Sequence, residues 1–174
     1  MQTNAEHLTK DLNELLSEFG RDFSELVFVE RFKNSGVSFD VSYLGVQKSY
    51  SFPFRYENER EISRYEKRFA KLALYHALSE ILDETLPWGA LTGIRPTKLA
   101  RSQGAKWRSF FTDLMCVSEK KTALTERILE VQKPYIVDDD SVFDLFVSIP
   151  LCPTRCEYCS FISEEISKEK AVNE

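Results

Sequence analysis

The sequence predicts an α+β fold, in which a small antiparallel sheet packs against helices. Two patterns predict it: apolar and polar residues alternate over residues 37–43 and 46–54, as in half-buried strands, and a helical period runs over residues 57–86. The chain has 174 residues, 43% of them apolar and 29% charged, which is typical of a folded protein and too apolar for a disordered one. This length fits one domain, or one and a fraction.

The first expected element is a helix over residues 5–19. Its leucines recur on one face, and Gly20 follows as a natural C-terminal stop. Turns are expected at Asn34-Ser35-Gly36 and at Gly45, because these residue types interrupt alternating segments. The strands between them form a three-stranded antiparallel meander over residues 26–29, 37–43 and 46–54.

The longest helix is expected over residues 57–86, with Pro87 at its end. Its apolar side chains lie close to one stripe, so it can cover the sheet. His76 falls on this stripe, where a histidine is more often a hydrogen-bonded core residue than a ligand. Shorter helices follow from Pro96 to Gly104, around Trp107 to Leu114, and from a Ser118 cap through Val131.

A connection between two units is expected after the last of these helices. Lys133-Pro134 and the acidic run Asp138–Asp140 favour exposed backbone, although a solvated loop inside one domain explains them equally well. Residues 142–149 have the length and β-rich content of a largely buried strand, and Pro150 closes it. Residues 163–174 are polar with helical propensity. On this basis we divide the chain into an α+β domain and a second unit, residues 1–136 and 137–174.

Charge and hydropathy argue against two classes of partner. Acidic residues outnumber basic ones by 28 to 23, so the net charge is −5 and no broadly basic surface is available to bind nucleic acid. A membrane span needs a run of about 18 apolar residues, and no segment approaches that length. The first ten residues lack the pattern of a signal peptide. We therefore expect no nucleic acid, no membrane and a cytoplasmic location.

Three of the four cysteines, Cys152, Cys156 and Cys159, lie at spacings of four and three directly after the last expected strand. Clustered thiols in a chain without a signal peptide indicate metal or redox chemistry instead of a disulfide framework. Three cysteines can hold a [4Fe–4S] cluster and leave one iron open for another ligand. A zinc site is one alternative, although no fourth ligand lies nearby, and three inert cysteines on a helix face are another.

Two segments resemble a known family. IPLCPTRCEYCSF at residues 149–161 resembles the radical S-adenosylmethionine enzymes and, more closely, their oxygen-independent coproporphyrinogen III oxidase group. WGALTGIRPTKL at residues 88–99 is similar to a segment upstream of the barrel in the coproporphyrinogen dehydrogenase variant. The resemblance implies that the chain ends in the first strand and cluster loop of a truncated radical-SAM (β/α) barrel. It covers most of the chain.

The same resemblance implies roles for four residues. Cys152, Cys156 and Cys159 would hold a [4Fe–4S] cluster whose open iron chelates S-adenosyl-L-methionine, and Tyr158 would contact that cofactor. The implied reaction is oxidative decarboxylation of two coproporphyrinogen III propionates to vinyl groups in haem biosynthesis. A porphyrinogen substrate and an electron donor of the flavodoxin or ferredoxin type are the implied partners.

The remaining expectation concerns activity. A barrel needs about 200 residues or more, and only 15 residues follow Cys159, so we expect the N-terminal portion of such an enzyme, inactive as this chain alone, with a poorly packed last strand. The alternative is a non-enzymatic module that binds haem or a partner and carries a vestigial cluster loop. His7 or His76 would then be the candidate haem ligands.

Two smaller features leave alternatives open. Arg95 and Lys98 stand near a helix start and can bind an anion, or they can simply face water on a capped helix. Cys116 has no cysteine or histidine close in sequence and is interpreted as a buried thiol.

Overall fold

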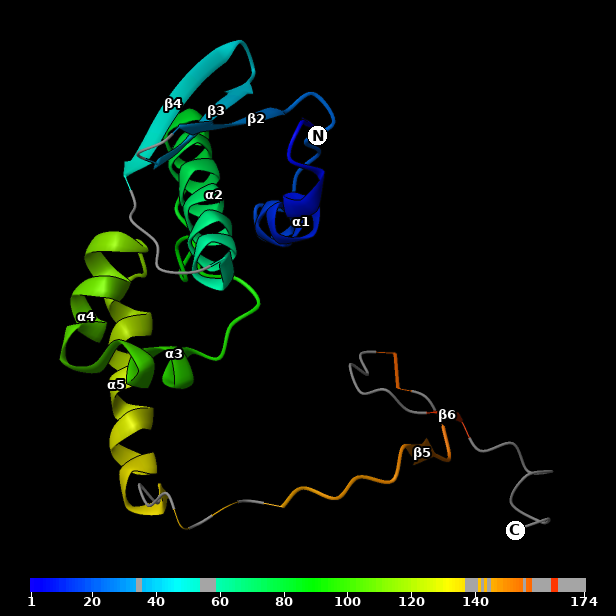
Figure 1. Ribbon diagram of the computed structural model, residues 1–174, viewed down its shortest axis with the longest axis vertical. Helices are drawn as coiled ribbons and strands as arrows, with labels where there is room; N and C mark the ends of the chain where they lie inside the picture. Colours follow the sequence, from blue (N-terminus) through cyan, green and yellow to red (C-terminus); the bar gives the residue numbers. More distant parts are fainter. Residues whose placement is uncertain are drawn as a thin grey trace. The chain divides into compact units, whose positions relative to one another are not determined.

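The computed structural model separates the chain into two compact units, Met1–Pro134 and Tyr135–Glu174. Figure 1 follows the chain through both of them. The structure describes residues 1–33, 36–53, 59–136, 141, 143, 145–154, 156–157 and 164–165. The expected turn residues Asn34 and Ser35 and the acidic run Asp138–Asp140 lie outside this part of the chain.

The described residues of the first unit form a sheet of four strands, in the order β1-β2-β3-β4. The strands are β1 (Gln2–Thr3), β2 (Val27–Lys33), β3 (Gly36–Tyr43) and β4 (Val46–Pro53). The antiparallel meander of β2, β3 and β4 confirms the predicted one. The prediction of three strands was nevertheless incomplete, because β1 adds a fourth strand that runs parallel to β2. Two residues are too few to show an alternation in the sequence.

The turn between β3 and β4 has the geometry that its sequence demands. Leu44 and Gly45 both have positive φ, of 50° and 75°. Two central residues of positive φ make the type of two-residue turn that matches the right-handed twist of paired strands. Tyr43 therefore pairs directly with Val46, and this register fixes which side chains of β3 face the core.

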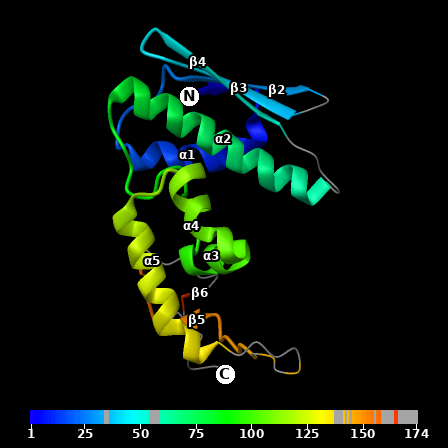
Figure 2. The same cartoon turned by 90° about the vertical axis from the view of Figure 1, so that its left-hand side faces the viewer.

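One face of the sheet is covered by helices α1 (Thr9–Glu18) and α2 (Glu59–Leu82), which lie side by side in Figure 2. A 3-10 turn, η1 (Glu6–Leu8), leads into α1, and Gly20 follows it with a φ of 61°. Between the sheet and these helices the rings of Phe28 and Phe39 are fully buried with their centroids 5.3 Å apart. The expected helix over residues 5–19 is thus confirmed, with a 3-10 first turn.

Helix α2 differs from the prediction at its end and in its burial. It stops at Leu82, and Asp83 takes a positive φ of 52°, so the expected end at Pro87 was wrong. The start expected at residue 57 lies outside the described residues. Burial extends beyond one stripe, because the helix is enclosed by the sheet, by α1 and by the segment after it. The fully buried small residues include Ala70, Ala73 and Ala77.

A second group of helices packs on the side of α1 and α2 that faces away from the sheet (Figure 2). It contains α3 (Pro96–Gln103), η2 (Gly104–Lys106), α4 (Trp107–Ser109), η3 (Phe110–Leu114) and α5 (Glu119–Gln132), followed by η4 (Lys133–Tyr135). The helix expected from Pro96 to Gly104 is confirmed. The segment from Trp107 to Leu114 is not one regular helix: it ends in a π-helical turn that places Phe111 edge-on against Trp107, with centroids 5.5 Å apart.

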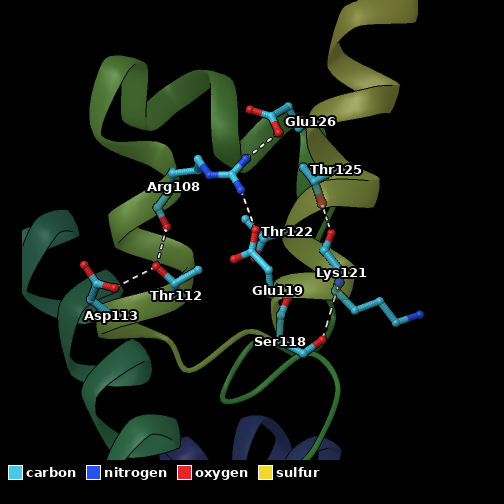
Figure 3. Close-up of polar contacts among 9 residues, drawn as sticks. All are labelled: Arg108, Thr112, Asp113, Ser118, Glu119, Lys121, Thr122, Thr125 and Glu126. Atoms are coloured by element: carbon cyan, nitrogen blue, oxygen red, sulfur yellow. Dashed lines mark hydrogen bonds and ion pairs between the residues drawn. The ribbon is translucent and has the colours of Figure 1, made fainter.

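Helix α5 is held in place by polar side-chain contacts along its N-terminal half, as Figure 3 shows. The hydroxyl of Ser118 accepts from the backbone N–H of Lys121 at 3.4 Å, which confirms the predicted cap. The guanidinium of Arg108 pairs with Glu119 at 2.5 Å and with Glu126. Arg108 therefore ties α4 to two positions on α5 that are about two turns apart.

The second unit has little regular structure among its described residues. Its two short strands, β5 (Leu151–Cys152) and β6 (Glu164–Glu165), pair in parallel. The largely buried strand expected over residues 142–149 was wrong for the described part: residues 145–150 form no strand, and Phe146 and Val147 are about four-fifths exposed. A strand requires paired neighbours, and β5 and β6 offer two residues each. Residues 163–174 have helical propensity, but their described part, Glu164–Glu165, forms strand β6 instead of a helix.

No helix among the described residues combines the length and the apolar character that a membrane-spanning segment requires.

Candidate functional site

The cysteine loop begins within the strand pair of the second unit. Cys152 is the last residue of β5, pairs with Glu165 of β6 and is half-buried, whereas Cys156 is exposed. Both are free thiols. Cys159 and Tyr158 lie outside the described residues, so the roles expected of them stay predictions.

The donor set of this loop suits a soft metal centre. Cys152 and Cys156 are two accessible thiols four residues apart, and neither is consumed in a disulfide. Thiolates are the ligands that iron–sulfur clusters require. The loop residues present are therefore compatible with an iron–sulfur cluster.

The fourth cysteine has a different environment. Cys116 is half-buried instead of fully buried, and its Sγ lies 3.9 Å from Nε2 of His76. Burial raises the pKa of the Cys116 thiol, which disfavours the thiolate that binds metals. His76 also stacks on the ring of Tyr50, with centroids 5.9 Å apart, and burial lowers the pKa of its imidazole. His76 thus packs against its neighbours, as a histidine on an apolar stripe is expected to do.

The segment at residues 88–99 joins several helices of the first unit. Gly89 has a φ of 56°, and a Cβ there would lie 2.1 Å from the carbonyl oxygen of Met115. Only glycine permits this approach, which lets the N–H of Ala90 donate to the same Met115 carbonyl at 2.9 Å. The ammonium of Lys121 lies 5.2 Å from the centroid of the Trp88 ring and so connects α5 to the segment.

Threonine and glycine in the middle of this segment contact the helices under the sheet. The ammonium of Lys71 on α2 donates to both the carbonyl and the hydroxyl oxygen of Thr92, at 3.2 and 3.1 Å. Gly93 has a φ of 61° and leaves room for the carboxylate of Glu14 on α1. Thr92 is buried and therefore contributes to packing, not to an anion site.

Basic side chains gather beside the end of this segment. Arg95 and Lys98 are exposed and line a hollow of about 540 Å³ together with Arg64 and Arg68 of α2. The guanidinium of Arg68 lies 4.8 Å from the centroid of the Phe110 ring, and burial lowers its pKa. Four cationic groups around one hollow can bind an anion such as a carboxylate. The sequence identified Arg95 and Lys98 but gave no sign of the two arginines from α2.

A second polar cluster brings together His7 of η1, Glu30 of β2 and Glu66 of α2. His7 Nε2 lies 2.5 Å from Oε1 of Glu66 and 3.8 Å from Oε2 of Glu30. Burial, together with the neighbouring Glu66 carboxylate, raises the pKa of Glu30 to about 7. No local pattern in the sequence indicates this cluster, because His7 and Glu66 are 59 positions apart.

Comparison with known proteins gives one informative similarity. The chain is 29% identical over 135 residues to the oxygen-independent coproporphyrinogen-III oxidase-like protein HemZ of Bacillus subtilis (strain 168). The aligned region covers 72% of this chain and 27% of that protein, so the chain spans about a quarter of its relative's length. No family model matches the chain, and no solved structure matches it significantly. The similarity confirms the resemblance that the two motifs indicate.

Proposed function

We propose that this chain supplies the N-terminal α+β domain and the cluster loop of a radical S-adenosylmethionine enzyme of the oxygen-independent coproporphyrinogen III oxidase type. Residues 1–136 form the domain and residues 137–174 begin the barrel. The similarity to a coproporphyrinogen-III oxidase-like protein supports this proposal. The observation that carries it is the loop with Cys152, Cys156 and Cys159 at spacings of four and three.

In this proposal the three cysteines bind a [4Fe–4S] cluster, and Tyr158 contacts S-adenosyl-L-methionine. Three thiolates leave one iron without a protein ligand, which gives the cofactor a place to bind. When bound, the two groups supply the radical that removes hydrogen from a substrate propionate. The pairing of Cys152 with Glu165 holds the first ligand at the end of a strand.

The substrate, the partners and the location are part of the same proposal. The substrate is a porphyrinogen, two of whose propionates are oxidatively decarboxylated to vinyl groups. An electron donor of the flavodoxin or ferredoxin type reduces the cluster. The free thiols of Cys152 and Cys156 suit a reducing compartment, which favours the cytoplasm.

The test is anaerobic reconstitution of the 174-residue chain with iron and sulfide. We expect four irons and four sulfides per chain, and single substitutions Cys152→Ala, Cys156→Ala and Cys159→Ala should each abolish the cluster absorption. Cys116→Ala is the matched control, because this thiol lies beside His76 and outside the loop. Iron uptake that survives all three loop substitutions would refute the proposal. So would stoichiometric zinc binding by the loop with no uptake of iron.

A further inference from the structure

The cluster of His7, Glu30 and Glu66 leaves one buried polar atom without a partner. The side chains of Glu30 and Glu66 are only 6% and 9% exposed, and they lie next to each other beneath His7. Oε1 of Glu30 is buried and accepts no hydrogen bond from any described residue. A buried carboxyl group in this situation is stabilised by a proton, a hydrogen-bond donor or a bound cation.

The two glutamates have little cationic support from the protein. Among the described residues no lysine or arginine forms an ion pair with either of them, so the imidazole of His7 is the one basic side chain beside the pair. Burial and the Glu66 carboxylate raise the pKa of Glu30 to about 7, so a proton occupies this position in part of the molecules near neutral pH. A divalent cation would displace that proton, pair with both carboxylates and occupy the free lone pairs of Glu30.

The three ligand groups come from three separate elements that other contacts already hold together. The side chain of Asn4 donates to the backbone carbonyl of Glu30 at 2.9 Å, and the N–H of Glu30 donates to Oδ1 of Asn4 at 2.8 Å. These two bonds fix the segment that carries His7 against β2. Preorganised ligands lose little entropy when an ion binds.

We propose that His7, Glu30 and Glu66 form a binding site for a divalent transition-metal ion such as Zn²⁺. Their ligand atoms all lie within 4.8 Å of one another. Ligands at about 2.0–2.2 Å around a tetrahedral zinc ion are separated by roughly 3.3–3.6 Å. The distances from His7 Nε2, 2.5 Å to Glu66 and 3.8 Å to Glu30, lie on either side of that separation.

The chemistry of the ligands selects the class of metal. One imidazole with two carboxylates suits zinc and its first-row neighbours better than magnesium, which prefers oxygen ligands alone. The side chain of His7 is 55% exposed, so an ion can enter from solvent and water can complete its coordination. This site is independent of the cysteine loop and of the function proposed above.

The experiment measures Zn²⁺ binding by equilibrium dialysis in the full chain carrying Cys152→Ser, Cys156→Ser and Cys159→Ser. These changes remove the loop thiols, which would otherwise bind zinc. We expect one ion per chain that millimolar Mg²⁺ does not displace. His7→Gln and Glu66→Gln should each weaken binding at least about tenfold, since even the loss of an outer-shell partner costs that much.

His76→Gln is the matched control, because His76 lies on the same helix as Glu66 and beside the remaining thiol of Cys116. It should leave the zinc affinity unchanged. Circular dichroism establishes that each variant is folded, and if Glu66→Gln unfolds the chain, His7→Gln decides, since its side chain is largely exposed. The proposal is overturned if the parent chain binds no stoichiometric zinc. It is equally overturned if His7→Gln leaves the affinity unchanged, or if His76→Gln is the variant that abolishes binding.

Discussion

The two units of this chain contain the same kinds of apolar residue in opposite environments. In Met1–Pro134 the rings of Phe39 and Phe111 are fully buried, whereas in Tyr135–Glu174 Phe143 and Phe146 are 83% and 82% exposed. Both regions have the composition of a buried segment. Apolar content alone therefore does not bury a side chain, because burial also requires a partner surface.

The partner surface in the first unit is a paired sheet. Strand β3 lies between β2 and β4 and is paired with a neighbour on both sides, so its backbone is satisfied and its apolar face can pack on α2. Residues 145–150 form no strand and have no such neighbours among the described residues. A strand-like sequence therefore becomes a strand only where the rest of a sheet exists.

The largest expected effect comes from a matched pair of phenylalanines. Phe39→Ala should lower the free energy of unfolding by about 3–5 kcal/mol, because it removes a fully buried ring that lies 5.3 Å from Phe28 and 6.2 Å from Phe52 between centroids. Phe146→Ala should change it by less than about 0.5 kcal/mol, since that ring is exposed. Urea unfolding followed by circular dichroism measures both. Comparable losses would remove the contrast between the units.

A second pair of substitutions measures how tightly the first unit is packed. Gly89 and Gly104 have the same φ of 56°, but a Cβ meets the Met115 carbonyl at the first and nothing within 4 Å at the second. Gly104→Ala should cost about 1–3 kcal/mol from backbone strain alone, because φ 56° with ψ −139° is a conformation that residues other than glycine rarely adopt. Gly89→Ala adds a clash with backbone and should cost about 1–3 kcal/mol more than Gly104→Ala. Equal costs would mean that the segment at residues 88–99 is loosely packed. The thermal unfolding midpoint of each variant decides.

The fold was predictable from the sequence where one period extended over a whole element. The alternation of Val37 to Tyr43 gave β3, and Gly45 gave the turn after it, because side-chain direction and turn geometry are local properties. Strand β1 could not be predicted, since its two residues are held by pairing with β2 and by the bonds of Asn4. The predicted end of α2 was wrong because the helix was expected to continue until Pro87. It stops earlier, where Asp83 adopts a positive φ.

The same distinction applies to the candidate sites. Cys152, Cys156 and Cys159 are visible in the sequence because ligands of one loop are close along the chain. The cluster of His7, Glu30 and Glu66 is invisible there, because its members meet only when η1, β2 and α2 pack together. Long-range sites of this kind follow from tertiary structure alone.

The smallest expected effect concerns pH and the interior of the first unit. Burial lowers the pKa of His76, which faces Tyr50 on β4, Tyr75 and Glu80 on its own helix, and Cys116. Glu80 opposes this effect by favouring the charged imidazole. In the unfolded chain the histidine titrates at about pH 6.5. The unfolded state therefore takes up a proton before the folded state does.

Stability that His76 contributes should accordingly be complete above about pH 6.5 and be lost as the pH falls toward the lower folded pKa. His76→Gln removes the titrating group, so the unfolding free energy of the variant should decline less between about pH 7 and pH 5 than that of the unsubstituted chain. Urea unfolding at several pH values gives both curves, and their difference cancels the contributions of all other groups. Parallel curves would mean that the imidazole is as well solvated in the folded chain as in the unfolded one. The packing of α2 against β4 would then be looser than the stacking of His76 on Tyr50 indicates, and the first unit would differ less from the second than burial implies.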